Sequence, residues 1–145
     1  MHGKPKILIF LLRISLGWVF FYSGISKILD KTWSAKDFLL SAKTFSNFYD
    51  WFALPVNLPW VNFANSWGQL LVGAALLLGI FVGLAAFSAA ALMALYYFPG
   101  LHFPYVANGV LIDEHIIYLI ALFLLVRLRA GRVWGLGSFF GRTLY

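Results

Sequence analysis

The sequence contains no cysteine and few ionisable side chains of any kind. Among its 145 residues are 11 lysines and arginines, five aspartates and glutamates, and three histidines. Without cysteine the chain cannot form disulfides, thiolate nucleophiles or cysteine-ligated iron–sulfur clusters. Because two of the three histidines lie near a chain end or in a loop, we expect no metal centre and no haem within this chain.

Hydrophobic residues, by contrast, make up 62% of the chain, and charged residues make up only 11%. A soluble domain of this size cannot bury so much apolar surface, so lipid must surround most of the chain. The net charge of +6 comes from basic residues at the two ends and in one loop rather than from a continuous patch, so we expect no nucleic-acid partner. The sequence predicts an all-α membrane protein that forms a single domain over residues 1–145.

Four apolar stretches are long enough to cross a bilayer as helices. They cover about residues 7–27, 64–80, 82–98 and 113–130 and predict a four-transmembrane-helix bundle. The first stretch is too long for the apolar core of a signal peptide, so we expect it to be retained. The segments at both ends are basic and lack acidic residues, which predicts a multi-pass protein of the cell (inner) membrane with both termini cytoplasmic.

The long loop after the first stretch carries an amphipathic pattern. Over residues 34–52 apolar side chains recur at helical spacing, and polar side chains occupy the other positions. Ser34 with Asp37 three residues later predicts a capping box at the start of this segment. We therefore expect one amphipathic surface helix in the first outer loop, lying on the membrane or covering the bundle.

Two basic residues, one inside the first stretch and one at its far end, interrupt the apolar pattern. Arg13 and Lys27 are 14 residues apart, so at about 100° per residue they return to nearly the same helix face. Gly17, Phe20 and Gly24 lie on that face as well. An arginine inside hydrocarbon costs about 2.5 to 3.5 kcal/mol on insertion scales. The face should therefore turn inward toward a partner, a water-filled cavity or a ligand.

A second polar stripe marks the start of the second stretch. Asn62, Ser66, Gln69 and Gly73 are spaced so that they share one helix face. Gln69 could hydrogen-bond across the bundle to the helix of Arg13 or line a pocket. Ordinary interhelical hydrogen bonding, worth about 0.6 kcal/mol, is the alternative that needs no function.

Polar residues also gather where the fourth stretch begins. Asp113, Glu114 and His115 are consecutive, and Tyr118 lies one turn after Glu114. Glu114 is expected at nearly the same membrane depth as Lys27, which predicts an ion pair between the two side chains. A carboxylate beside histidine and tyrosine can relay protons or bind a carbonyl headgroup. The simpler alternative is that the acidic residues complement the helix dipole.

Aromatic residues make up 19% of the chain, and many gather near the predicted outer boundary. Most are expected to form an ordinary interfacial belt. An alternative is that Phe20, Trp67, Tyr97 or Tyr118 lines a flat hydrophobic slot for an isoprenoid quinone, and periodicity does not distinguish the two.

Short motifs spread along nearly the whole chain are typical of a known family. They are Arg13, Gly17, Phe20, Ser23-Gly24 and Lys27, the segments 68–70, 76–79 and 131–136, and Asn108 with Glu114-His115. In these residues the chain resembles the DoxX family of small bacterial and archaeal membrane proteins. The resemblance implies a four-helix membrane bundle related to the DoxD subunit of thiosulfate:quinone oxidoreductase, which passes electrons from thiosulfate to membrane quinone.

The sequence departs from the family pattern at two positions. Gln69 stands where many members have a glutamate, and Gly137 stands where an aspartate is common. A carboxamide does not titrate, so this chain cannot use a side chain at position 69 to carry a proton.

The leading hypothesis is an integral membrane subunit of a redox system, linked to quinone and to oxidation of a small sulfur compound such as thiosulfate. Whether the chain itself is an enzyme stays open, and its expected partners are membrane lipid, a partner oxidoreductase subunit and a second copy of the chain. The alternatives are a non-catalytic scaffold that recruits a soluble oxidoreductase, and a small transporter or lipid-binding protein. The expected catalytic residues are Glu114, His115 and Lys27, and the expected quinone-binding residues are Arg13, Phe20, Gln69 and Tyr118.

Overall fold

Three of the apolar stretches fold as helices long enough to cross a membrane in the computed structural model, which describes residues 4–139. These helices cover Pro5–Leu29, Leu58–Leu78 and Val82–Gly100, with mean hydropathies of 1.8, 1.3 and 1.6. Few of their side chains are buried inside the protein, so lipid must cover the rest. The prediction of a helical membrane protein is confirmed.

The described elements follow one another in a simple order. They are α1 (Lys4–Leu29), α2 (Lys36–Leu40), α3 (Ser46–Ala53), α4 (Leu58–Leu78), α5 (Val82–Gly100), the strands β1 (Tyr105–Val106) and β2 (Gly109–Val110), α6 (Glu114–Arg127), and the 3-10 turns η1 (Ala130–Arg132) and η2 (Leu136–Phe139). The two strands form a small antiparallel hairpin, in which Tyr105 pairs with Val110.

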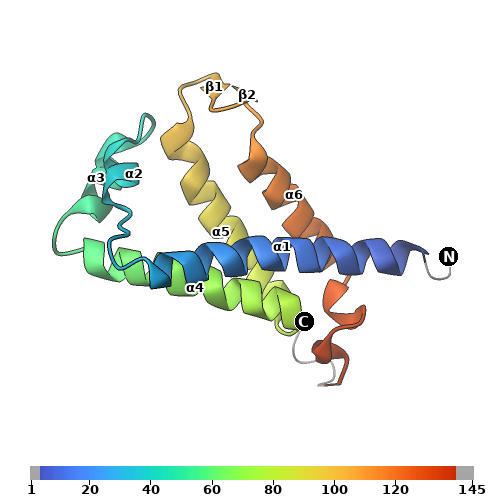
Figure 1. Cartoon of the computed structure of the whole chain (residues 1–145). Helices are drawn as coiled ribbons and strands as arrows, with labels where there is room; N and C mark the ends of the chain where they lie inside the picture. The colour runs from blue at the N-terminus through green and yellow to red at the C-terminus, as the bar shows by residue number, and fades with distance from the viewer. Residues whose placement is uncertain (1–3, 140–145) are drawn as a thin grey trace.

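The helices form two pairs that lean apart (Figure 1). Helices α1 and α4 run side by side in opposite directions, and α5 packs along α6. Helices α4 and α5 are joined by the short turn 79–81 and diverge from it. We call the end that carries α2, α3 and the β-hairpin the loop end, and the end that carries the 79–81 turn and η1 the turn end.

The contact between α1 and α4 depends on glycine. A Cβ atom at Gly24 would collide with the backbone of Leu70, and one at Gly73 would collide with the backbone of Phe21. A Cβ atom at Gly17 would lie 2.9 Å from the backbone nitrogen of Leu77. Small residues let the two backbones approach closely, which is how helices associate in lipid when no hydrophobic effect drives them together.

The segment after α1 differs from the prediction. The single surface helix expected over 34–52 was wrong, because the structure has two short helices, α2 and α3, with a break between them. Phe45 adopts a left-handed conformation with φ of 56°, which a continuous helix does not allow. Contacts with the end of α5 fix the break, since the backbone N–H of Lys43 donates to the carbonyl of Pro99 and the hydroxyl of Thr44 donates to that of Leu101.

These two helices cover the loop ends of α4 and α5. Tyr49 is only 2% exposed, and its hydroxyl donates to the carbonyl of Leu95 in α5 over 2.8 Å. The expected capping box is also absent, because Ser34 Oγ accepts a hydrogen bond from the N–H of Lys36 while Ala35 occupies the capping position.

Two predicted spans have different lengths from those expected. Helix α4 begins at Leu58, before the expected start at 64, because Pro59 lies in the first turn, where a missing N–H costs nothing. Helix α6 has 14 residues, a length of about 21 Å against the 30 Å of a hydrocarbon core. It cannot cross the membrane alone, and a fourth crossing over 113–130 stays a prediction.

Candidate functional site

Polar side chains from three helices meet at the loop end. Lys27 of α1 donates hydrogen bonds to the side-chain carbonyl of Gln69 in α4 and, over 3.2 Å, to the hydroxyl of Ser23. Ser23 donates to the same Gln69 carbonyl over 2.8 Å. The Gln69 amide nitrogen then donates to the hydroxyl of Tyr96 in α5 over 3.0 Å. The predicted hydrogen bond from Gln69 across to the first helix is confirmed.

Lys27 has no carboxylate partner in the described part of the chain. The ion pair found among residues 4–139 joins Asp113 and His115, and the predicted pair between Lys27 and Glu114 was wrong. Glu114 is exposed on the first turn of α6, whereas the ammonium group of Lys27 is already held by Gln69. A glutamate at position 69 would pair with this lysine, whereas the carboxamide of Gln69 leaves its charge uncompensated.

Two aromatic rings flank the ammonium group. Its nitrogen lies 5.2 Å from the ring centre of Trp33 and 5.9 Å from that of Tyr96. Such contacts stabilise a cation by about 0.5 to 2 kcal/mol, the larger value applying where water is excluded. The rings therefore help to hold a charged lysine at the membrane boundary.

The lysine opens onto a cavity of about 260 Å³, which we call the polar cleft. Its lining residues come from α1, the loop before α2, α2 itself, α4, α5 and α6, and they are Lys27, Trp33, Ser34, Ala35, Phe38, Asn65, Tyr96 and His115. The cleft thus brings together Lys27 and His115, two of the residues predicted from the sequence.

A second cavity of about 140 Å³, the apolar slot, adjoins the polar cleft. Its wall is almost wholly hydrophobic and includes Tyr49, Phe52 and Trp60. The two cavities are neighbours because they share four lining residues: Ala35, Phe38, Asn65 and Tyr96. Together they offer a polar compartment with a cation and an apolar compartment beside it.

Asn65 lies on the wall that the two cavities share. Its side-chain carbonyl oxygen is buried and has no hydrogen-bond partner in the described part of the chain. Leaving a buried acceptor unpaired costs about 1 to 3 kcal/mol. A hydroxyl or amine of a bound molecule would satisfy this oxygen.

His115 is held by the residue that caps its helix. Asp113 Oδ1 accepts hydrogen bonds from the backbone N–H groups of His115, at 3.0 Å, and Ile116, at 3.4 Å. Asp113 Oδ2 lies 2.8 Å from His115 Nδ1. From the sequence, Asp113 was expected only to complement the helix dipole. The feature that could have predicted its contact with the His115 ring is an aspartate at the helix cap two residues before a histidine.

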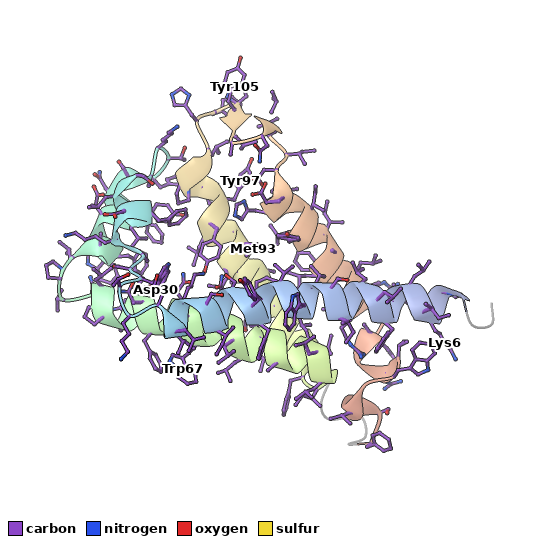
Figure 2. All side chains as sticks on the ribbon, viewed as in Figure 1. Lys6, Asp30, Trp67, Met93, Tyr97 and Tyr105 are labelled. Atoms are coloured by element: carbon purple, nitrogen blue, oxygen red, sulfur yellow. The ribbon has the colours of Figure 1, made fainter. Side chains whose placement is uncertain are left out.

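The remaining predicted residues lie outside the polar cleft. Arg13 is about 21 Å from Lys27 along α1, by the rise per residue, and Lys6 and Asp30 mark the two opposite ends of this helix (Figure 2). Phe20 is 2% exposed in the main core, and Tyr118 packs against that core.

Arg13 binds backbone carbonyls at the turn end. Its Nη1 donates to Ala130 over 2.6 Å and to Val133 over 2.8 Å, and its Nη2 donates to Trp134 over 3.2 Å. The side chain is fully buried. The inward orientation predicted for the helix face of Arg13 and Lys27 is confirmed. The two side chains bind at opposite ends of the protein, Arg13 at the turn end and Lys27 at the loop end.

Six of the eight lining residues were not predicted from the sequence, among them Trp33, Asn65 and Tyr96. Trp33 and Tyr96 looked like members of the interfacial aromatic belt, and Asn65 lies one position off the polar stripe of the second span. The alternative aromatic slot was also composed of other residues than expected, since Trp67 lies on the outside of α4 and is 42% exposed (Figure 2).

Comparison with known proteins gives one match. The model of a family described as DoxX matches residues 8–100, nearly two thirds of the chain. No curated protein and no solved structure matches the chain. The matched segment includes Lys27, Gln69 and Tyr96 and ends before Asp113 and His115.

Proposed function

This chain belongs to the DoxX family, and from that premise we propose that it is an integral membrane subunit of a quinone-linked redox system. The observation that carries the proposal is the pair of adjoining cavities, one with a cation and polar atoms and the other apolar. An isoprenoid quinone has the same two parts, a polar ring and an apolar tail. The polar cleft holds the ring, and the apolar slot holds the start of the tail.

The lining residues fit the chemistry of a quinone ring. Lys27 donates a hydrogen bond to one ring oxygen, because its charge is not neutralised by a carboxylate. The unpaired carbonyl of Asn65 accepts from the hydroxyl of the reduced ring. When bound, the quinone supplies transfer of two electrons and two protons. The site proposed here keeps Lys27, Gln69 and His115 from the sequence prediction and adds Asn65.

Electrons reach this site from outside the chain. The sequence has no cysteine, so it offers no thiol relay of its own. A small sulfur compound such as thiosulfate is the proposed donor, acting directly or through a partner subunit. This part of the proposal rests on the family relationship.

The proposed topology has four crossings. Helix α6 packs along α5, and residues 128–139 continue from it toward the turn end, where Arg13 binds them. Arg127, Arg129 and Arg132 follow the apolar part of α6. Basic residues favour the cytoplasmic side, so the turn end and both termini face the cytoplasm of the cell that carries this protein in its membrane.

The test is to purify the protein in mild detergent, extract it with solvent and measure quinone by mass spectrometry against membrane phospholipid. We expect about one quinone per chain, lost from Lys27→Gln because a neutral amide binds the ring oxygen more weakly. Lys31→Gln is the matched control, since Lys31 is exposed beyond the end of α1. Folded parent protein without enriched quinone would contradict the proposal.

A non-catalytic scaffold is the second candidate, and one observation favours it. The Lys27, Gln69 and Tyr96 hydrogen bonds join α1, α4 and α5, so they can fix helix packing without any ligand. A scaffold predicts that Lys27→Gln lowers thermal stability and that the parent carries no quinone. A quinone-binding subunit predicts loss of quinone even where the variant stays folded.

A further inference from the structure

We propose that Asp113 is a positioning residue that fixes the tautomer of His115, so that His115 Nε2 is the proton acceptor of the polar cleft. The inference rests on the proposed function, in which quinone is reduced to quinol. Nε2 accepts a proton from a hydroxyl of that quinol in the reverse direction, so in the forward direction the imidazolium gives this proton to the reduced ring oxygen. The inference assigns a role to Asp113, which the proposed quinone contacts do not use.

Backbone hydrogen bonds hold the carboxylate of Asp113 in place beside the imidazole ring of His115. Its Oδ1 accepts from two backbone N–H groups at the start of α6, and this directs Oδ2 toward His115 Nδ1 at 2.8 Å. The Asp113 side chain is 6% exposed and that of His115 is 24% exposed. The pair is therefore mostly shielded, with the imidazole as its more accessible member.

The contact determines which ring nitrogen carries the hydrogen. An ionised carboxylate offers only acceptor lone pairs, so Nδ1 must be the donor in this hydrogen bond. In a neutral imidazole the other nitrogen, Nε2, then has a free lone pair. His115 lines the polar cleft, and the inference directs this lone pair toward the cleft.

The charged and titratable groups around the ring suit a proton acceptor. Lys27 faces the same cleft from α1, and Tyr96 of α5 packs edge-on against the imidazole with ring centres 6.3 Å apart. Asp113 and Glu114 come from the start of α6 itself. The cleft residues contributed by α2 and the loop before it, such as Ser34 and Phe38, do not titrate.

The transfer balances within the cleft. In the reverse direction the O–H bond of the quinol breaks, its proton forms a bond to Nε2, and the electron pair stays on the ligand oxygen; in the forward direction the N–H bond breaks and the proton returns to that oxygen. Asp113 stabilises the positive imidazolium, and Lys27 stabilises the negative oxygen. The ligand class is therefore a ring with an acidic hydroxyl, which a quinol provides and the oxidised quinone does not.

The first test reads the tautomer directly. In the detergent-solubilised protein labelled with 15N-histidine, with His115 assigned through His115→Gln, nitrogen NMR should show Nδ1 protonated and Nε2 bare. In Asp113→Asn the amide keeps the cap, because asparagine caps helices as well as aspartate does. Its NH2 group then donates to Nδ1 and moves the hydrogen to Nε2. A bare Nδ1 in the parent, or an unchanged tautomer in Asp113→Asn, would overturn the positioning role.

The second test measures binding of a short-tailed benzoquinol and of the matching benzoquinone. In Asp113→Asn the quinol should bind about tenfold more weakly, which is the effect of one lost hydrogen bond, while the quinone should bind at least as tightly as in the parent, because the hydrogen now on Nε2 can donate to a quinone carbonyl. Asp113→Ser keeps a capping side chain, so it separates loss of the cap from loss of the ring contact. Equal effects on both ligands would overturn the acceptor role.

The two proposals fail in different ways. A parent protein with the expected tautomer that binds neither benzoquinol nor benzoquinone contradicts the quinone function and the acceptor role, but it leaves the positioning of His115 by Asp113 standing. A parent that binds quinone and has the opposite tautomer contradicts only the inference made here.

Discussion

The ammonium group of Lys27 and the carboxamide of Gln69 form a cation–amide pair that joins α1 to α4. The amide accepts from Lys27 and Ser23 on one side and donates to Tyr96 on the other, so each of its polar atoms is used. A neutral partner holds the lysine in position without cancelling its charge. The pair therefore combines helix packing with a charge available to a ligand.

Replacing the amide tests this combination. Gln69→Leu should lower the free energy of unfolding by about 1 to 3 kcal/mol, because Lys27, Ser23 and Tyr96 all lose a partner. The measurement is denaturation in detergent followed by circular dichroism. Asn65→Leu is the comparison variant, since the Asn65 oxygen has no partner to lose and the substitution removes the side-chain hydrogen bond of Asn65 with Tyr96. It should lower stability less than Gln69→Leu and yet reduce the quinone content; equal destabilisation by both variants would contradict this account.

The glycine contact between α1 and α4 predicts a sharp difference between neighbouring positions. Gly24→Ala should lower the free energy of unfolding by about 1 to 3 kcal/mol, because the new methyl group meets the backbone of Leu70. Gly68→Ala on α4 should be neutral or stabilising, since a Cβ atom there meets nothing within 4 Å. Thermal unfolding of the two variants side by side decides the matter, and similar melting temperatures would count against the packing described.

The buried Arg13 should hold the segment after α6 in place. In Arg13→Gln the carbonyls of Ala130, Val133 and Trp134 lose donors of a kind worth about 1.5 to 3 kcal/mol each. Because the chain has no cysteine, Ala130→Cys provides a single thiol at a fully buried position.

That thiol should react with a water-soluble maleimide much faster in the Arg13→Gln background than in the Lys6→Gln background, where an exposed lysine near the same helix end is neutralised. Quinone content should stay the same in both. Loss of quinone from Arg13→Gln alone would return Arg13 to the binding site.

The exposure of Glu114 predicts that its charge is dispensable for binding. Glu114→Gln should keep its quinone within about a factor of two, which is under 0.5 kcal/mol, because the side chain does not line the polar cleft. His115→Gln, one residue further on, should lose quinol binding. Quinone loss in the Glu114 variant would show that the carboxylate reaches the ligand after all.

Burial raises the pKa of Tyr49 above its ordinary value of 10.0. The phenol of Tyr49 therefore loses its proton at a lower pH in the unfolded chain than in the folded chain. The contribution of Tyr49 to stability is complete below pH 10 and falls as the pH rises further. Tyr49→Phe should lack this alkaline loss and should cost about 1 kcal/mol near neutral pH, where the hydrogen bond to Leu95 is missing.

Unfolding followed between neutral pH and pH values above 10 checks the sign of the Tyr49 effect. Tyr105→Phe serves as the control, because Tyr105 is 61% exposed on the hairpin. If the stability of both phenylalanine variants depends on pH in the same way as that of the parent, the buried phenol of Tyr49 does not contribute as described.

Sequence periodicity was sufficient for features that depend on one helix or on one helix pair. The inward face of the first helix and the cross-bundle bond of Gln69 both follow from spacing and from the cost of polar groups in lipid. The partner of Lys27 did not follow, because the predicted pairing with Glu114 rested on membrane depth alone, and depth does not show whether Glu114 or Gln69 lies nearer to the lysine. Only the placement of α4 against α1 decides between them.

Features that need three or more segments could not be predicted from periodicity. The break at Phe45 depends on contacts with the end of α5, which is about fifty residues further along the chain. The polar cleft needs Asn65 and Tyr96 from two helices and Trp33 from a loop. None of these residues differs locally from an ordinary interfacial residue, and only their convergence makes them a site.

Gly79 follows α4 in the short turn that leads to α5, and it has φ of 70°. A Cβ atom there would lie 2.7 Å from the Cα of Gly135 and 2.9 Å from Nη1 of Arg13, so the turn is packed tightly against both residues. The polar cleft and the apolar slot lie at the other end, where α4 and α5 stand apart (Figure 1). We therefore expect a bound molecule to change the angle between the two helices, and spin labels at the loop ends of α4 and α5 would report occupancy as a change in distance.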